Sequence, residues 1–495
     1  MSKTKTIPPL DLMWLLMETQ AAPTHVGAMM LFEKPRGRPG TVREIVEFYR
    51  SFEPTPPFNY IPELAGAHAP YFREVDHWDP LYHIQFLALP SGSSYEDFLR
   101  LIADLHEPML DRSRPLFRLW VIDDVPGGRF AVYTKVHHSI IDGASGSQRM
   151  YASLSLRARD PIRPPAFAVR TPVRKPRPPK ALAERLAALG TTAGKQTLAL
   201  SDVWLGALRK TFTALTGSDP GGSQPFTAHP APMNEPMKMA RTYATLSLPL
   251  EEMQKVGHHF GATLNDLAIT IVDEGVHRYL RQTGRAFPQR LVAFCPMSLR
   301  DEGDTEAKTK ASAMFVHLGQ PDSAVDDRIR EVTAQMAVAK KELRAMSKDA
   351  AMAYAVAVLG LAELRAAPGI AQVTRPLANL VISNVPGGKE TMYSNGARLV
   401  GTFPVSAVAA SIGLNATLTS DSGRMDFGFV GNGATMYQLP DLARHVADAY
   451  QELKAAAGMS RGRAGDAAGR GTAGRAARPR PRPRPKASRT SRGRK

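Results

Sequence analysis

The sequence predicts a mixed α/β protein that is built from two domains. Apolar residues recur with the alternating periods of strands and helices in residues 1–157, and the same mixture returns in residues 236–458. Between these regions, residues 158–235 are rich in proline, arginine, lysine and alanine, which is typical of a linker. A chain of 495 residues also exceeds the size at which one hydrophobic core stops growing. Two cores are therefore expected.

The first predicted domain, residues 1–157, contains strand and helix patterns in alternation. Strands are indicated by β-branched and aromatic runs, and helices by apolar residues that recur every three or four positions. The predicted elements are strands at Val26–Phe32 and from Phe130 onward, and helices at Thr41–Phe52, Tyr95–Leu105 and Ala144–Leu156.

Beyond the first domain, the linker is predicted to carry helices at Leu182–Leu189 and Leu198–Leu215. The second domain then begins with the alternating segment Arg241–Leu248 and the helix Leu264–Arg281. Further strands are predicted at Leu291–Cys295, Leu380–Ser383, Leu414–Thr419 and Met425–Val430. The last segment, residues 459–495, is a basic low-complexity tail of arginine, proline, glycine and alanine, which we expect to be disordered.

Composition limits the compartment and the kind of site. The single cysteine, Cys295, excludes an internal disulfide and a zinc site built from several thiolates, so a reducing, cytoplasmic location is expected. The N-terminal residues lack the apolar stretch of a secretory signal. The longest charge-free helical run, Ala350–Ala362, is shorter than the roughly 20 residues that span a bilayer. Any membrane contact is therefore expected to be peripheral.

The net charge of +17 is concentrated at one end of the chain. Residues 461–495 hold thirteen Lys or Arg and one acid, which leaves a net charge of only +5 for the other 460 residues. Such a tail suits either nucleic-acid phosphates or anionic lipid headgroups. It lacks the aromatic residues that interleave with basic ones in many nucleic-acid binders, so the lipid surface is preferred.

The predicted strand from Phe130 ends in two adjacent histidines, His137 and His138. Because side chains alternate along a strand, His138 shares a face with Thr134 and Val136, while His137 points the other way. His138 then lies where the strand passes into a loop, a place where a side chain can meet substrate. A neutral imidazole there can take a proton from a hydroxyl near neutral pH.

Two other interpretations of the pair compete with catalysis. Adjacent histidines are often two satisfied polar residues, and histidine is also a common metal ligand. Metal binding is disfavoured because the two rings diverge and because no second cluster has clear ligand spacing. The sequence therefore predicts neither a metal nor a cofactor.

Longer motifs decide between these interpretations. The segment His137-His138-Ser-Ile-Ile-Asp142-Gly143 resembles the His-His-x-x-x-Asp-Gly signature of the coenzyme-A-dependent acyltransferase superfamily. Over roughly residues 8–455, further segments are similar, in the same order, to the bacterial wax ester synthase and diacylglycerol acyltransferase family. These segments are Pro9–Glu18, His25–Gly27, Asn265–Asp266, Pro296–Arg300, Asn384–Gly387 and Asp426–Gly428.

The resemblance implies two chloramphenicol-acetyltransferase-like domains with an active-site tunnel between them. It also implies that His138 is the general base, supported by His137. The base would activate a long-chain alcohol or diacylglycerol hydroxyl, which attacks acyl-coenzyme A, so coenzyme A enters as part of a substrate. By the same resemblance Asp142 shapes its loop, paired with Arg300, and Gly143 supplies freedom or close approach at the turn.

Other motif residues have local explanations. Thr263-x-x-Asp266 is typical of a capping box, so Asn265 and Asp266 are expected to open a helix rather than to do chemistry. Asn384 begins a turn after a strand, and its amide is a candidate for binding the substrate oxyanion.

The sequence leaves three questions open. Residues 404–414 lack the aspartate-glycine pair that the family commonly has, so the acceptor, fatty alcohol or diacylglycerol, is not determined. A catalytically inactive relative that binds lipid or acts as a scaffold would share the same motifs. A nucleic-acid-binding role of the tail is the third alternative.

Overall fold

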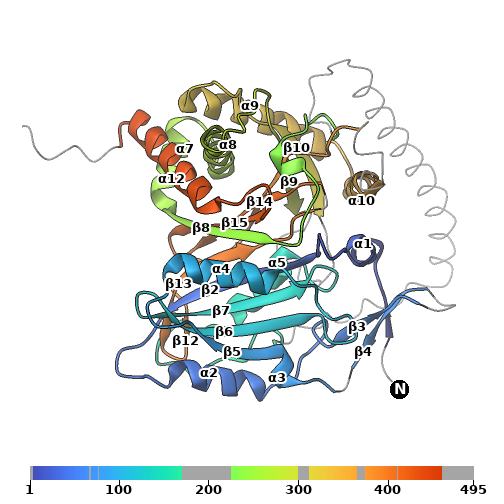
Figure 1. The fold of residues 1–495 in the computed structure, drawn as a ribbon, viewed down its shortest axis with the longest axis vertical. Coiled ribbons are helices and arrows are strands. Elements are labelled where there is room, and N and C mark those ends of the chain that lie inside the picture. Colours follow the sequence, from blue (N-terminus) through green and yellow to red (C-terminus); the bar gives the residue numbers. More distant parts are fainter. Residues whose placement is uncertain are drawn as a thin grey trace, which may run out of the picture. The chain divides into compact units, whose positions relative to one another are not determined.

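The computed structural model describes residues 4–65, 69–75, 77–169, 225–298, 311–364, 374–409 and 411–459. Within these ranges the chain forms two six-stranded sheets, each covered by helices (Figure 1). A small third sheet joins β1 (Thr4–Thr6), β4 (Tyr71–Glu74) and β3 (Tyr60–Glu63). The predicted helices in the linker, the tail from residue 460 onward and Arg300 lie outside the described residues. The exact domain boundaries stay predictions.

The first sheet is antiparallel except for the pairing of β5 with β6. Its strand order is β12 (Tyr393–Ser394), β13 (Ala397–Val405), β2 (His25–Glu33), β7 (Arg129–His137), β6 (Phe117–Val125) and β5 (Ile84–Ala88). Its helices are α2 (Thr41–Arg50) and α3 (Pro80–His83) on one side and α4 (Tyr95–His106) on the other (Figure 1).

Alternation along β2 explains why both faces of the first sheet are covered. Met30 and Phe32 lie in one hydrophobic cluster with residues of α2, whereas Met29 and Leu31 lie in another with residues of α4. A strand with apolar side chains on both faces must be buried on both faces, which requires a helical layer on each side.

The second sheet is mixed, because β11 runs parallel to both of its neighbours. Its order is β10 (Ala311–His317), β9 (Val292–Ser298), β11 (Leu380–Val385), β14 (Leu414–Asp421), β15 (Arg424–Asn432) and β8 (Arg241–Pro249). One face packs against α7 (Leu250–His259), α8 (Leu264–Gln282), α9 (Val325–Arg344) and α12 (Leu439–Ala456). The other face packs against α10 (Lys348–Leu364).

Helix α8 begins as the sequence predicts. The hydroxyl of Thr263 accepts a hydrogen bond from the Asp266 backbone N–H at 3.3 Å, and the Asp266 carboxylate accepts one from the Thr263 N–H at 2.9 Å. This reciprocal pair is a capping box, which satisfies donors that a helix N-terminus leaves without partners. The predicted cap is confirmed.

A buried ion cluster crosses the second core. Arg328 of α9 has no exposed surface, and it lies 2.8 Å from Oδ2 of Asp273 and 2.9 Å from Oε2 of Glu274, both on α8. Oδ2 of Asp273 also accepts a 2.9 Å hydrogen bond from the Gly319 N–H. Because buried charges are stable only when paired, this cluster fixes α9 against α8.

The chain crosses from the second sheet into the first at β13, which pairs with β2 in an antiparallel register that includes Val405 opposite Gly27. This exchange is not evident from the sequence, since a strand pattern does not identify the strand with which it pairs. The residues that follow β13, 406–409 and 411–412, line the cavity described below.

The Asp426–Gly428 segment of β15 holds this crossing strand. Oδ2 of Asp426 accepts a 2.8 Å hydrogen bond from the Thr402 N–H of β13, and Oδ1 accepts one from the Ser247 hydroxyl at 2.6 Å. A Cβ atom on Gly428 would lie 1.8 Å from the Pro404 carbonyl oxygen, so only glycine lets β13 approach. These residues, quoted above for a family resemblance, thus have a packing role.

Candidate active site

A cavity of about 340 Å³ is lined by residues of both sheet-based domains. The first domain contributes α1 (Pro9–Met17), β2, β7 and α5 (Gly143–Ala152), and the second contributes β9, β11, β14, α10 and the crossing segment. Most of the lining side chains are apolar or small, such as Val26, Met150, Leu359 and Ala362. The cavity is therefore suited to hydrocarbon chains.

His138 lies at the wall of this cavity, immediately after the end of β7. Its side chain is half-buried there, and the buried Thr134 and Val136 of the same strand face line the cavity beside it. His137 has no exposed surface and does not line the cavity. The predicted divergence of the two imidazoles is thus confirmed.

Burial lowers the pKa of His138 below its ordinary value of 6.5, and the nearby His137 acts in the same direction. The Asp142 carboxylate opposes this shift, because a negative charge favours the imidazolium. The net direction keeps the ring neutral near pH 7. A neutral imidazole is the form that can accept a proton.

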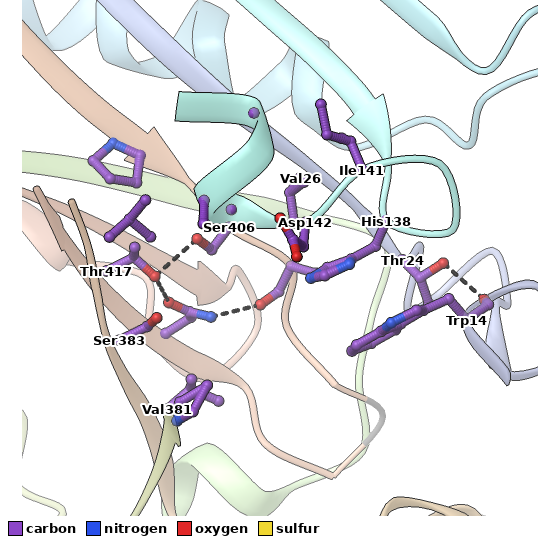
Figure 2. A pocket seen from close by; sticks show the side chains of 18 of the residues that line it. Trp14, Thr24, Val26, His138, Ile141, Asp142, Val381, Ser383, Ser406 and Thr417 are labelled. Atoms are coloured by element: carbon purple, nitrogen blue, oxygen red, sulfur yellow. Dashed lines mark hydrogen bonds between the residues drawn. The ribbon is translucent and has the colours of Figure 1, made fainter. Parts of the chain in front are cut away.

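One face of the His138 ring is covered by Trp14 of α1. The two ring centroids are 4.3 Å apart and the ring planes differ by 15°, which is a parallel stack. Figure 2 shows the indole alongside the imidazole at the cavity wall. Leu10, Trp14 and Met17 all line the cavity, as expected for residues three and four positions apart on one helix face.

His137 is held by a buried network on the opposite side of β7. Its Nδ1 accepts the Ser139 backbone N–H at 3.1 Å, so the ring N–H that can donate is at Nε2. Nε2 lies 3.1 Å from Oγ1 of Thr24 and 3.4 Å from Oε2 of Glu18. The Thr24 hydroxyl donates to the Trp14 carbonyl oxygen at 2.9 Å.

Glu18 anchors this network from the end of α1. Its side chain is fully buried and lies 2.9 Å from the Arg112 guanidinium, which also donates to the Leu15 carbonyl oxygen at 2.6 Å. Burial alone would raise the pKa of Glu18, but its contacts with His137 and Arg112 lower the pKa below the ordinary value. A buried carboxylate of this kind is stable because it is paired.

Asp142 and Gly143 form the turn after His138. Oδ1 of Asp142 accepts a 2.8 Å hydrogen bond from the Ser145 N–H, so Asp142 caps the N-terminus of α5. A Cβ atom on Gly143 would lie 3.2 Å from Cγ2 of Val385, so the glycine permits a close approach to β11 of the other domain. The Arg300 partner expected for Asp142 lies outside the described residues.

Two segments that the sequence singled out separately meet in the second domain. The Asn384 side-chain amide, at the end of β11, donates a 2.7 Å hydrogen bond to Oδ1 of Asn265 at the start of α8. Asn384 lines the cavity and Asn265 does not. Asp266, the capping residue, lies 3.3 Å from the Lys340 ammonium.

A polar wall, formed by Ser406, Thr417 and Asn415, interrupts the apolar lining. Ser406 donates to Thr417 at 2.8 Å, Thr417 donates to Oδ1 of Asn415 at 2.7 Å, and the Asn415 amide donates to the Ala407 carbonyl oxygen at 2.8 Å. Figure 2 shows this chain of hydrogen bonds. Since each hydroxyl has one proton, Ser406 can only accept a hydrogen bond from a ligand.

Sequence reasoning missed Trp14, Thr24 and the polar wall, although parts of each carried a signal. The spacing of Leu10, Trp14 and Met17 indicates one helix face, and Asn415 and Thr417 alternate with apolar neighbours in β14. The contact of Trp14 with His138 depends on how α1 packs against the end of β7. Local pattern does not reveal that contact.

Neither a metal cluster nor a membrane-spanning helix is present among the described residues. No group of three or more His, Cys, Asp or Glu side chains in that part of the chain is placed to hold a metal ion. No described helix is long and apolar enough to cross a bilayer.

The fold itself defines a class. Two sheet-based α/β domains, arranged as observed, are the chloramphenicol-acetyltransferase-like fold of the coenzyme-A-dependent acyltransferase superfamily, which confirms the predicted fold class. The first condensation domain of the calcium-dependent antibiotic synthetase shares it with a TM-score of 0.54, at 16% identity, over 92% of this chain and 96% of that chain. At this identity the likeness concerns the fold alone.

Sequence comparison is more specific. Residues 7–268 match the wax ester synthase/diacylglycerol acyltransferase catalytic domain, and residues 309–454 match the C-terminal domain of the same family. The chain therefore belongs to the wax ester synthase/diacylglycerol acyltransferase family.

Two relatives illustrate the match. The Mycobacterium tuberculosis (strain H37Rv) protein named as probable diacylglycerol O-acyltransferase Tgs4 is 31% identical over 464 residues, which span 92% of this chain and 97% of the relative. The solved wax ester synthase/diacylglycerol acyltransferase from Marinobacter aquaeolei VT8 is similar at 26% identity with a TM-score of 0.72. That comparison covers 92% of this chain and all of the Marinobacter chain.

Proposed function

We propose that this protein transfers a long-chain acyl group from acyl-coenzyme A to the hydroxyl of diacylglycerol or of a long-chain alcohol. The products are triacylglycerol or a wax ester, and free coenzyme A. His138 is the general base. The observation that carries this proposal is the His138 imidazole, whose pKa burial lowers, at the wall of an apolar cavity that both domains line.

The chemistry follows from that arrangement. His138 takes the proton of the acceptor hydroxyl as its oxygen bonds to the thioester carbonyl carbon, which forms a tetrahedral oxyanion. The carbon–sulfur bond then breaks, and the leaving thiolate takes the proton from the His138 imidazolium. No covalent acyl-enzyme is needed.

The oxyanion requires a hydrogen-bond donor from the cavity wall. Ser406 has no proton left to donate, because its hydroxyl proton goes to Thr417. The Asn384 amide has two protons, of which one goes to Asn265, so one remains. Asn384 is therefore our candidate for binding the oxyanion.

The apolar lining supports a long-chain substrate. Each methylene group transferred from water to an apolar wall contributes about 0.8 kcal/mol, so a long acyl chain gains affinity where a short one does not. Leu359 and Ala362 of α10 and Phe294 of β9 provide such walls. We propose that the acceptor binds in the same cavity, because its hydroxyl must reach His138.

The test is an acceptor screen with palmitoyl-coenzyme A labelled in the acyl group. The purified chain is incubated with hexadecanol, with a diacylglycerol or with neither, and the labelled products are separated by chromatography. Labelled wax ester or triacylglycerol that requires both substrates supports the proposal. Lipid binding without any labelled ester would favour the alternative of an inactive lipid-binding relative.

We also propose that residues 461–495 bring the enzyme from the cytoplasm to an anionic lipid surface, such as a membrane or a lipid droplet. The tail carries thirteen basic residues and one acid, and each basic residue near such a surface contributes about 1 kcal/mol. Vesicles with and without phosphatidylserine are compared for binding of the full chain and of a chain that ends at residue 460. Equal binding of the two chains would contradict this role, and tight binding to duplex DNA that depends on the tail would favour nucleic acid instead.

A further inference from the structure

Trp14 covers one face of the imidazole that we propose as the base. The indole belongs to α1, and its centroid lies 4.3 Å from that of His138 with a 15° angle between the planes. Trp14 also lines the cavity, so the stacked pair forms part of the cavity wall. The stack therefore calls for a chemical explanation.

An indole face carries negative electrostatic potential, so it attracts a cation more strongly than a neutral ring. The His138 imidazole is neutral before the reaction and becomes an imidazolium when it takes the acceptor proton. The contact with Trp14 thus strengthens as the transition state forms. An interaction that is stronger in the transition state than in the bound substrate complex raises the rate of the chemical step. An interaction that is equally strong in both does not.

We propose that Trp14 is a positioning residue for the acyl transfer: it orients the His138 ring and stabilises its protonated form, while His137 keeps Trp14 in place through Thr24. The inference rests on the proposed function, and it assigns to Trp14, Thr24 and His137 a joint role in the site.

The hydrogen bonds that connect these residues all run in one direction. The Ser139 N–H donates to Nδ1 of His137, so the ring N–H that can donate is at Nε2, 3.1 Å from the Thr24 hydroxyl. The Thr24 hydroxyl in turn donates to the carbonyl oxygen of Trp14. His137 can therefore act on the Trp14 backbone without facing the cavity.

The hydrogen bond from Thr24 supports the C-terminal end of α1. Trp14 is among the last four residues of α1, whose carbonyl oxygens have no partner within the helix. Thr24 satisfies the carbonyl of Trp14, and Arg112 satisfies that of Leu15. The buried Glu18 holds Arg112 and lies beside His137, so the end of α1 is tied to the motif strand.

The experiment compares Trp14→Leu, Trp14→Phe and Thr24→Val with the full-length wild type. It measures kcat, the KM for palmitoyl-coenzyme A and the pH dependence of kcat/KM. Trp78→Leu is the matched control, because Trp78 also lies near a histidine, with its ring centroid 5.6 Å from that of His83, but does not line the cavity.

The expected loss in kcat is about ten-fold for Trp14→Leu and smaller for Trp14→Phe, because phenylalanine keeps a π face. The KM should stay within about two-fold, since the interaction acts mainly in the transition state. The acidic limb of the pH profile should move to lower pH in Trp14→Leu, because the imidazolium loses a stabilising neighbour. Thr24→Val should also lower kcat and move the acidic limb of the pH profile to lower pH, but by smaller amounts. Trp78→Leu should change neither kcat nor the position of the acidic limb.

The pH profile separates this role from simple damage. If Trp14→Leu only lets water into the cavity, the limb moves up toward the ordinary histidine value, which would overturn the inference. The other groups acting on His138, Asp142 and His137, are unchanged in this variant. If Trp14→Leu does not fold, the test uses Trp14→Phe and Thr24→Val instead. Wild-type kinetics in both of these variants would overturn the inference.

Failure of the proposed function is recognised separately. A wild type that makes no ester from any acceptor removes both the proposed function and this inference. A wild type that is active, with His138→Ala inactive and Trp14→Leu fully active, removes the inference alone.

Discussion

The Asn384 side-chain amide donates a 2.7 Å hydrogen bond to Oδ1 of Asn265, which joins the end of β11 to the start of α8 beside the cavity. Asn265 accepts this bond through its side-chain carbonyl oxygen. It therefore orients the Asn384 amide by holding its NH2 end. The relationship gives Asn265 a function that its place in a capping box does not explain.

We predict that Asn384→Ala lowers kcat by about 100-fold, the typical effect of removing one oxyanion donor. Asn265→Ala should lower kcat less, because the Asn384 amide remains present but is less well oriented. Steady-state thiol release at saturating palmitoyl-coenzyme A measures both effects. A larger loss for Asn265→Ala than for Asn384→Ala would contradict this assignment of roles.

The pH dependence follows from the environment of His138. Burial lowers the pKa of the imidazole, so the neutral, proton-accepting form persists below the ordinary value of 6.5. As pH falls through the lowered pKa, the ring becomes protonated and activity is lost. The acidic limb of wild-type kcat/KM should therefore have its midpoint below about pH 6.5, and a midpoint above that value would contradict the assignment.

The buried ion cluster of the second core makes a stability prediction. Arg328→Met leaves the Asp273 carboxylate buried without its cation and removes one of the cations beside Glu274, which should lower the free energy of unfolding by about 3–5 kcal/mol. The control is Arg330→Met on the same helix, because Arg330 pairs with Asp327 at the exposed surface and should cost less than about 1 kcal/mol. Urea unfolding measures both. Equal effects of the two variants would refute the cluster's role.

The crossing strand provides a second stability prediction. Gly428→Ala places a methyl group 1.8 Å from the Pro404 carbonyl oxygen, so β13 must move, at a cost of about 1–3 kcal/mol. Gly360→Ala in α10 meets nothing within 4 Å and should instead stabilise the helix by about 0.5–1 kcal/mol. Thermal unfolding should shift in opposite directions for the two variants. A stabilised Gly428→Ala would show that β13 is not held as described.

Local pattern predicted a good deal of this molecule. The period of two along β7 separated His138 from His137, and the Thr263-x-x-Asp266 spacing identified the start of α8. Both features depend only on residues a few positions apart, which is the range over which periodicity and capping act.

The contacts that complete the site could not be predicted in the same way. Trp14 meets His138 across more than one hundred residues, and Ser406 of the polar wall follows β13, for which the chain leaves the second sheet after β11 and pairs with β2 of the first. Such meetings depend on strand order and on the packing of two domains. A single sequence contains no local signal for either.

The most direct test of the central claim is the rate of coenzyme A thiol release from palmitoyl-coenzyme A and a long-chain acceptor in His138→Ala and His137→Ala. We predict a loss of about 100-fold or more for His138→Ala, since the base is removed. His137→Ala should keep appreciable activity, since that ring supports the site without facing the cavity. Equal rates for wild type and His138→Ala would contradict the assignment of His138 as the general base.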